Sequence, residues 1–229
     1  MKTVIAIDGY SGSGKGTLAR LLSQELHIPH LDSGAIYRMI TYFLCPNEKF
    51  NPTDIEGVLE KVFEDLDYVL IQNQWVFLSK GKNIEDFIRQ PWINNKISAI
   101  SGLVEVRNVA NNLFRRIGNE QDIIMDGRDI GTCVFPKATN KFFIKSNINQ
   151  RAERRYNQLK AFGYDDITLL EIKQNLQQRD SYDLKRTLCP LKKARNAITI
   201  NNTNITEQEL LDKALQHINK EPFLNIDKI

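Results

Sequence analysis

A glycine-rich segment near the amino terminus has the composition and spacing of a loop that binds phosphate. The sequence Gly-Tyr-Ser-Gly-Ser-Gly-Lys-Gly-Thr spans residues 9–17 and follows the apolar run Val4–Ile7. Glycines allow successive backbone N–H groups to point into one concavity, and a helix that begins near Lys15 adds its positive end. The Lys15 ammonium can then lie between the β- and γ-phosphate oxygens of a nucleotide. The segment therefore predicts a nucleotide-binding loop rather than a flexible turn.

Gly16 separates Lys15 from Thr17, whereas the commonest form of this loop has Ser or Thr directly after the lysine to hold magnesium. Two alternatives follow for Thr17. Its hydroxyl contacts the metal ion of the bound nucleotide directly, or it contacts that ion through a water molecule.

Two further segments place charged residues at the ends of predicted strands. Residues 32–38, Asp-Ser-Gly-Ala-Ile-Tyr-Arg, end a short strand and begin a helix. We expect Ser33 to cap this helix, so that its free N–H groups attract an anion that Arg38 can also bind. Residues 126–129, Asp-Gly-Arg-Asp, follow a strand, and ligands of open parallel sheets bind beyond the carboxyl ends of strands. The alternative for each segment is a set of surface charges without chemistry.

Arginines gather in the carboxyl-terminal third of the chain. Arg151 shares one helical face with Arg154 or Arg155, and like charges one turn apart repel each other unless an anion lies between them. A solvated basic face is the alternative. Residues 179–186 are predicted to follow a helix, and such a segment can bring two arginines over a phosphate while Asp183 accepts a hydrogen bond from a sugar hydroxyl.

The composition is that of a soluble globular chain of 229 residues, with 41% hydrophobic and 26% charged residues. A net charge of +3 is too small to indicate a nucleic-acid partner. The first apolar run is too short for a signal peptide, and no run approaches the length of a membrane span. We therefore expect a cytoplasmic protein without a membrane or nucleic-acid partner.

The cysteines Cys45, Cys133 and Cys189 are scattered and lack C-x-x-C pairing. This pattern indicates a reduced compartment and predicts neither a disulfide framework nor a zinc site.

Helix and strand signals alternate along the chain, which predicts an α/β fold with a parallel sheet and helices on both faces. Strands are expected at residues 3–8, 123–126, 141–145 and 197–201, and a further short strand is expected to end at residues 31–32. Helices are expected at residues 15–26, 35–44, 104–117, 150–161, 169–178 and 207–218, the last after a capping box at 206–209.

The middle of the chain interrupts this alternation. Thr53 and Asp54 are expected to cap a further helix, and strands at 68–72 and 75–79 are expected to flank a tight turn at Asn73-Gln74. A hairpin inside an α/β chain suggests an inserted subdomain at about residues 47–97. The alternative is a surface hairpin with no role in chemistry.

Taken together, these motifs resemble those of the bacterial cytidylate kinases, which transfer the γ-phosphoryl group of ATP to CMP or dCMP. The resemblance covers residues 5–218 and is carried by 7–17, 32–38, Gly-Arg-Asp-Ile-Gly-Thr-x-Val-Phe-Pro at 127–136, Arg-Ala-Glu-Arg-Arg at 151–155, Arg-Asp-x-x-Asp-x-x-Arg at 179–186 and Pro-Leu at 190–191. Residues 127–136 together with the phosphate loop are its most specific part. Bacterial members also carry an insertion in the monophosphate-binding region, which suits the predicted hairpin.

The resemblance implies a single P-loop kinase domain over residues 1–229, with a nucleoside-monophosphate-kinase-like fold. Its core would comprise residues 1–32, 102–148 and 187–220, its acceptor-binding region 33–101, and its lid about 149–186. The implied ATP-binding residues are Gly9, Tyr10, Ser11, Gly12, Ser13, Gly14, Lys15, Gly16 and Thr17. The implied catalytic contacts are Lys15, Arg128, Arg151, Arg154 and Arg186.

The acceptor CMP or dCMP would be bound by Ser33, Tyr37, Arg38, Ser98, Arg107, Arg128, Asp129, Arg179, Asp183 and Arg186. By resemblance, Ser98, Arg107 and Asp129 read the cytosine. Arg179 and Asp183 hold the sugar hydroxyls, and Arg38, Arg128 and Arg186 grip the monophosphate. Arg151 and Arg154 would lie on a mobile lid. A carboxylate and a guanidinium complement the amino donor and the two acceptors of cytosine, whereas uracil would present a carbonyl to Asp129.

Some positions differ from the family pattern. Tyr10 stands where the family usually has proline, and Leu184, Cys189, Asn196 and Asn202 replace residues that are often Ser or Asp. The expected mechanism is in-line transfer from Mg·ATP by a monomer, and it rests on positioning and charge stabilisation. Three alternatives stay open: a sibling kinase for UMP, AMP or another small acceptor, a non-catalytic P-loop module, and a nucleic-acid binder.

Overall fold

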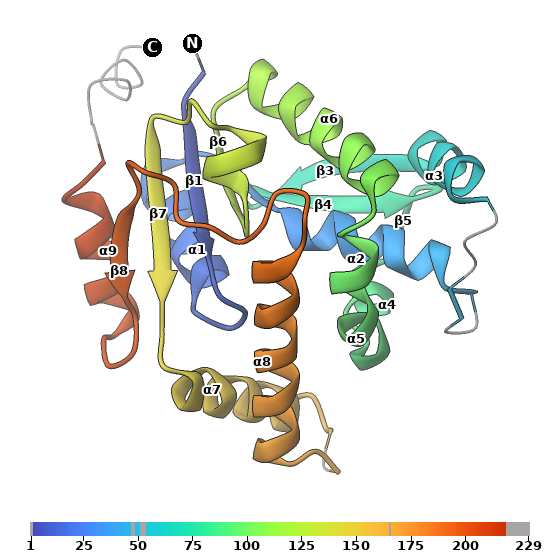
Figure 1. The fold of residues 1–229 in the computed structure, drawn as a ribbon. Helices are drawn as coiled ribbons and strands as arrows, with labels where there is room; N and C mark the ends of the chain where they lie inside the picture. Colours follow the sequence, from blue (N-terminus) through green and yellow to red (C-terminus); the bar gives the residue numbers. More distant parts are fainter. Residues whose placement is uncertain (1, 47–48, 51–53, 165, 219–229) are drawn as a thin grey trace.

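The computed structural model describes residues 2–46, 49–50, 54–164 and 166–218 (Figure 1). Its strands are β1 (Val4–Gly9), β2 (His30–Asp32), β3 (Leu66–Ile71), β4 (Gln74–Ser79), β5 (Lys82–Asn83), β6 (Ile123–Gly127), β7 (Asn140–Lys145) and β8 (Ile198–Asn201). Its helices are α1 (Lys15–Leu26), α2 (Ser33–Leu44), α3 (Ile55–Glu64), α4 (Glu85–Ile88), α5 (Pro91–Ile100), α6 (Val104–Glu120), α7 (Ile148–Ala161), α8 (Leu169–Lys185) and α9 (Glu207–Leu215). A π-helical turn, η2 (Ile130–Val134), follows β6.

The strands form one sheet in the order β3-β4-β2-β6-β1-β7-β8, and β5 pairs with β4. Strand β1 lies between β6 and β7 and is parallel to both, so the phosphate loop after β1 and the charged segment after β6 leave the sheet side by side. The predicted α/β fold is confirmed.

Helices cover both faces of the sheet because the side chains of β1 alternate between two cores. Val4 and Ala6 pack into a core with α2 and α6, whereas Ile5 and Ile7 pack into a core with α1 and α9. A strand with apolar residues on both faces requires a covering layer on each side, and Figure 1 shows these helices on the two sides of the sheet.

The predicted hairpin is present, but its turn lies one residue earlier than expected. Strands β3 and β4 pair antiparallel. Gln72 and Asn73 between them adopt left-handed conformations with φ angles of 48° and 59°, as a tight hairpin turn requires. The hairpin also joins the main sheet, since Gln74 pairs with His30 of β2. Thr53 and residues 47–48, where the insertion was expected to begin, lie outside the described residues.

Two helix predictions were wrong in ways that matter for the site. Asp32, not Ser33, is the N-cap of α2: its carboxylate accepts from the Gly34 N–H at 2.8 Å, and Ser33 is already helical. Helix α8 continues to Lys185 instead of ending near residue 178, so Arg179 and Asp183 project from a helix. A capping box at Thr168 begins α8. The last turns of α8 are polar, so the sequence does not indicate whether the helix ends near residue 178 or continues.

Helices α7 and α8 lie beyond the carboxyl end of β7 and pack against each other (Figure 1). They bury a small core of their own, formed by Ala152, Leu159, Ile172 and Leu176. In the described part of the chain, no helix combines the length and the apolar character that crossing a membrane requires.

Candidate active site

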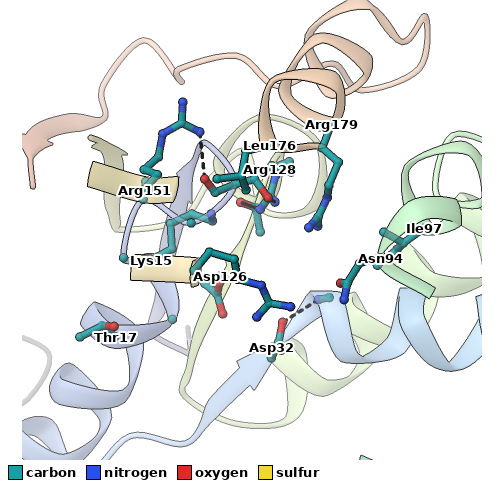
Figure 2. A pocket seen from close by; sticks show the side chains of 18 of the residues that line it. Lys15, Thr17, Asp32, Asn94, Ile97, Asp126, Arg128, Arg151, Leu176 and Arg179 are labelled. Atoms are coloured by element: carbon teal, nitrogen blue, oxygen red, sulfur yellow. Dashed lines mark hydrogen bonds between the residues drawn. The ribbon is translucent and has the colours of Figure 1, made fainter. Parts of the chain in front are cut away.

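A cleft of about 1060 Å³ opens at the carboxyl ends of β1, β2 and β6. One wall is the glycine-rich loop, residues 11–17, and the opposite wall comes from α2 and α5. Helices α7 and α8 contribute a third side. Figure 2 shows Arg179 reaching from α8 and Asn94 from α5 toward the same space, with Lys15 across from them. The cleft is therefore large enough for two ligands and is lined by segments far apart in sequence.

The glycine-rich loop has the backbone that its composition predicts. Gly12 and Gly14 adopt left-handed backbone conformations with φ angles of 71° and 95°, and Gly14 is the residue before α1. The hydroxyl of Ser13 is buried without a hydrogen-bond partner in the described structure, which leaves a polar atom available for an anion. Lys15 is 5% exposed and donates to the Tyr10 carbonyl at 2.8 Å. Burial, followed by the nearby Arg128 charge, lowers the Lys15 pKa to about 7.

Asp180 of α8 and Arg151 of α7 hold the start of this loop. One Asp180 oxygen accepts from the Ser11 N–H at 2.9 Å, and the other accepts from Arg151 at 2.5 Å. Arg151 also donates to the Ser11 carbonyl at 2.9 Å and lies over the Tyr10 ring. The helical pair α7–α8 is thus attached to the phosphate loop through buried, charge-assisted hydrogen bonds.

Asn202, directly after β8, supports the other end of the loop. Its amide donates to the Ser13 carbonyl at 2.9 Å, and its own carbonyl accepts from Arg154 at 2.9 Å. A Cβ atom at Gly14 would lie 2.2 Å from the Asn202 amide nitrogen and would push this amide away from the Ser13 carbonyl. The left-handed φ of 95° at Gly14 favours glycine independently.

Asp129 lies at the centre of a buried charged cluster beneath the cleft. One oxygen pairs with Arg107, and the other accepts from Arg186 at 2.6 Å. Arg107 is only 1% exposed, donates to the Ser101 carbonyl at 3.1 Å and lies over the Tyr37 ring. Each carboxylate oxygen still has a lone pair for a further donor, so the cluster can recognise an amino group.

Arg128 and Arg186 both face Asp183, which projects from the last turns of α8. Arg128 donates to Asp183 at 2.9 Å and to the Ser11 hydroxyl at 3.2 Å, and Arg186 lies 3.7 Å from the other Asp183 oxygen. These contacts join α8, the residues after β6 and the glycine-rich loop around one space.

Four other arginines concentrate positive charge on the cleft. Arg38 pairs with Asp32 at 3.2 Å, and Arg89 lies 3.8 Å from the same carboxylate. Burial, then Arg128 and Arg38, lower the Arg179 pKa to about 9, and the Arg179 Nε lacks a hydrogen-bond partner in the described structure. Burial, then Arg38 and Arg89, lower the Arg155 pKa. Guanidinium groups crowded in this way form a site for a polyanion, because an anion would relieve their repulsion.

Two carboxylates lie at the carboxyl ends of the central strands. Asp126 of β6 lines the cleft, and its Oδ1 lies 2.9 Å from the His30 Nε2. Asp8 of β1 accepts from the N–H groups of Ile130 and Gly131, both at 2.8 Å, and so fixes η2. Because burial outweighs these hydrogen bonds, the Asp8 pKa is raised to about 7.

Comparison with known proteins decides which family this arrangement belongs to. A family model described as cytidylate kinase matches residues 5–220. The chain belongs to the cytidylate kinase family. A cytidylate kinase of Caldicellulosiruptor saccharolyticus is 36% identical over 216 residues, which cover 94% of this chain and 95% of that protein. One of Alkaliphilus oremlandii is 37% identical over 211 residues, 92% of this chain and 95% of that protein.

A solved structure supports the fold alone. The crystal structure of an uncharacterized protein from Eubacterium ventriosum aligns with a TM-score of 0.52 at 13% identity, covering 95% of this chain and 98% of that one.

Most residues that the resemblance to the cytidylate kinases implied do line the cleft. They are Ser11, Gly12, Ser13, Gly14, Lys15, Gly16, Thr17, Ser33, Tyr37, Arg38, Ser98, Arg128, Asp129, Arg151, Arg154, Arg179, Asp183 and Arg186. Gly9, Tyr10 and Arg107 do not line it. Gly9 packs against the Ile144 backbone, Tyr10 packs against Phe143, and Arg107 lies behind Asp129.

Sequence reasoning missed several residues that line or build the site of this family member. They are His30, Arg89, Asn94, Asp180 and Asn202, and Asp32 of the chosen segment 32–38 was given no role in the site. Asp126 and Arg155, which the sequence analysis offered in the segment 126–129 and as a partner of Arg151, do line the cleft. Asp180 and Asn202 carry no local sequence signal, since their role depends on contacts with residues more than a hundred positions away.

The prediction of no disulfide was wrong. Cys133 of η2 and Cys189, three residues after Arg186, form a disulfide, and their Cα atoms lie 6.0 Å apart. Cys45 is free and buried. The 56-residue separation of the paired cysteines hid their proximity, which only the return of the chain from α8 creates.

Proposed function

We propose that this chain phosphorylates CMP or dCMP with ATP as the phosphoryl donor. The observation that carries the proposal is one continuous cleft lined both by a phosphate loop and by guanidinium groups from α2, the segment after β6, and α8. A phosphate loop alone serves many P-loop proteins. A second anion site facing it is what a transfer between two nucleotides requires.

The acceptor base would lie above the Asp129 cluster. The Asp129 carboxylate accepts from the cytosine amino group, and Arg107 holds that carboxylate in place from behind. Ser98, which lines the cleft, offers a hydroxyl to the base. Arg179 and Asp183 hold the sugar hydroxyls, and Arg38, Arg128 and Arg186 bind the monophosphate. UMP would bind less well because its carbonyl would face a carboxylate.

The residues present fit a magnesium ion. A hydroxyl and a carboxylate are oxygen ligands of the kind that Mg²⁺ prefers, and Thr17 and Asp126 both line the cleft. Thr17 and Asp126 would hold the ion directly or through water, and the ion would neutralise charge on the ATP phosphates. Phosphate oxygens would replace the contact of Lys15 with the Tyr10 carbonyl, and their negative charge would raise the Lys15 pKa because it favours the ammonium form.

The lid would act by excluding water. Arg151 and Arg154 contact the two ends of the phosphate loop, at Ser11 and through Asn202. Movement of α7 and α8 as one unit would be transmitted to the loop, which suits closure after both nucleotides bind. Closure predicts compaction in small-angle scattering when both substrates are present.

A coupled assay of ADP release across CMP, dCMP, UMP and AMP tests the proposal. Turnover is expected with CMP or dCMP, and much less with UMP and AMP. Arg128→Ala is expected to lower turnover about 10²–10³-fold, whereas Arg116→Ala, an exposed arginine of α6 outside the cleft, serves as the matched control. ATP binding without acceptor-dependent turnover would refute the proposed function.

A further inference from the structure

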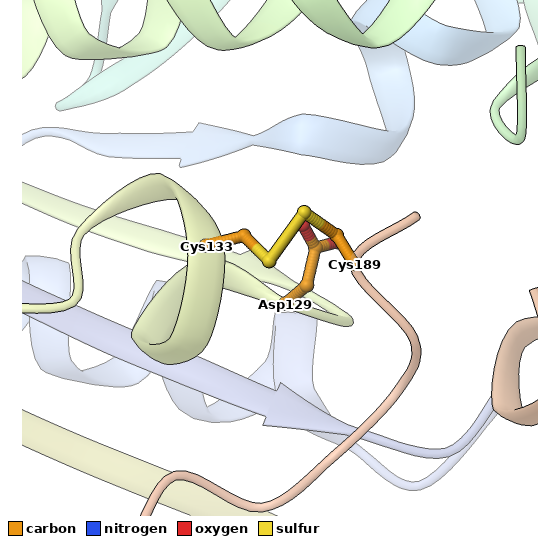
Figure 3. Close-up of side chains that lie close together, drawn as sticks. All are labelled: Asp129, Cys133 and Cys189. Carbon is orange, nitrogen blue, oxygen red and sulfur yellow. A yellow bond between two sulfur atoms is a disulfide. The ribbon is translucent and has the colours of Figure 1, made fainter. Parts of the chain in front are cut away.

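The disulfide between Cys133 and Cys189 lies beside the acceptor end of the cleft, and the phosphoryl transfer proposed above does not use it. Figure 3 shows Cys133 on the η2 turn, Cys189 on the segment that follows α8, and Asp129 next to both. One carboxylate oxygen and the two sulfur atoms lie within 4.8 Å of one another. The bond therefore connects two chain segments that meet at Asp129.

Each cysteine belongs to a segment that carries acceptor-site residues. Cys133 is four residues after Asp129, and its N–H donates to the Asp129 carbonyl at 2.8 Å. Cys189 accepts at its carbonyl from the Arg186 Nε at 2.7 Å, while the other end of that guanidinium binds Asp129 at 2.6 Å. Cys189 also adopts a left-handed conformation with a φ angle of 49°, and the chain turns back toward the core there.

The disulfide also crosses the base of the α7–α8 pair. The chain leaves the sheet after β7, passes through α7 and α8, and returns at Cys189. Leu191 then donates from its N–H to the Asp183 carbonyl at 2.8 Å. A covalent bond at the return point therefore limits how far Arg186 can move from Asp129.

We propose that Cys133 and Cys189 form a reversible thiol–disulfide site, and that the oxidised form holds Arg186 in the position that binds the acceptor phosphate. Both cysteines are half-buried rather than fully buried, so small thiols can reach them. In a reducing compartment such as the expected cytoplasm, the disulfides that do form are usually transient and either catalytic or redox-sensing. The effect on the acceptor rests on the proposed function.

The reaction needs a small-molecule disulfide as oxidant. One cysteine thiolate attacks a sulfur of that disulfide, forms a mixed disulfide and releases one small thiolate. The second cysteine thiolate attacks the protein sulfur of the mixed disulfide, forms the Cys133–Cys189 bond and releases the second small thiolate. Two electrons pass from the cysteines to the oxidant, and the two cysteine protons go to the two released thiols.

The test uses the full chain equilibrated with mixtures of reduced and oxidised glutathione, followed by acid quenching, thiol blocking and mass analysis. We expect Cys133 and Cys189 to interconvert together, with Cys45→Ser behaving as the parent because Cys45 is buried and free. Reduction is expected to weaken CMP binding about three- to tenfold in calorimetry, since Arg186 must then be ordered by the ligand. It is also expected to speed hydrogen exchange at the Leu191 amide but not at the Leu18 amide of α1.

In reduced glutathione, Cys133→Ser and Cys189→Ser are each expected to match the reduced parent in CMP affinity and in Leu191 exchange. In oxidised glutathione each should stop at the mixed disulfide, because the thiolate that would resolve it is missing, and mass analysis should show one glutathione adduct. A CMP affinity and a Leu191 exchange rate that are both unchanged by reduction would overturn the proposal, as would a pair that stays oxidised in every mixture. Stoichiometric Zn²⁺ bound by the reduced parent but not by Cys133→Ser would overturn it in favour of a metal site. Absence of CMP binding in both states would refute the proposed function, and the exchange measurement would still decide the redox site.

Discussion

Replacing the charge of Asp129 should produce the largest single loss of stability among the cleft residues. Asp129 and Arg107 are 3% and 1% exposed, and Arg186 shares the same carboxylate. In Asp129→Asn the shape is retained, but the buried Arg107 guanidinium loses its carboxylate partner, and among the described residues Arg186 keeps only the Asp183 carboxylate, at 3.7 Å. Removing one partner of a buried ion pair costs about 3–5 kcal/mol, which is a large fraction of a typical folding free energy of about 5–15 kcal/mol.

A double-mutant cycle separates this charge effect from general disruption of packing. Arg107→Met alone should also destabilise the protein, whereas Arg107→Met in the Asp129→Asn background should cost little, because it removes a cation that is already unpaired. We expect a coupling free energy of about 2 kcal/mol or more from urea unfolding followed by tryptophan fluorescence.

Asp67→Asn on the exposed side of β3 is the control, and it should change the unfolding free energy by less than about 0.5 kcal/mol. A coupling below about 0.5 kcal/mol would show that the charges of Asp129 and Arg107 do not depend on each other, and the reasoning would fail.

Three other predictions concern the phosphate loop and its surroundings. Lys15→Ala should lower turnover about 10²–10³-fold with little change in circular dichroism; full turnover would contradict the charge-stabilisation mechanism. Gly14→Ala should weaken ATP binding more than Gly16→Ala, because a Cβ meets the Asn202 amide at Gly14 but nothing within 4 Å at Gly16; calorimetry that ranks them oppositely would exclude this explanation. Burial raises the Asp8 pKa from 3.8 to about 7, so between pH 3.8 and 7 the folded protein binds more protons at Asp8 than the unfolded chain does. The contribution of Asp8 to the free energy of unfolding is therefore complete below pH 3.8 and is lost as the pH rises through 7. Asp8→Asn should remove this part of the pH dependence of urea unfolding, and an unchanged slope would assign it to another group.

The expectations of a monomer, of a cytoplasmic location and of the domain boundaries remain predictions. The individual roles of the site residues also remain predictions, which the assays above address. The family and the α/β fold are established by the matching family model and by the sheet topology.

Local chemistry explains what the sequence by itself determined. The run Val4–Ile7 is apolar throughout and therefore predicts a strand that is buried on both faces. The glycines before Lys15 allow the left-handed φ angles that a phosphate loop needs. Both the strand and the loop can thus be predicted from neighbouring residues. Arg128 and Asp129 could be chosen because they follow a buried strand. These signals act over a few residues and do not depend on the rest of the fold.

Only the tertiary structure decided which distant groups meet. Asp180 reaches the Ser11 N–H across 169 residues, Asn202 reaches the Ser13 carbonyl across 189, and Cys133 meets Cys189 across 56. No periodicity or propensity encodes such pairs, because each depends on where α8 ends and on how the chain returns to β8. The phosphate loop and the sheet could therefore be predicted from the sequence, whereas the packing of α7 and α8 on that loop could be seen only in the folded structure.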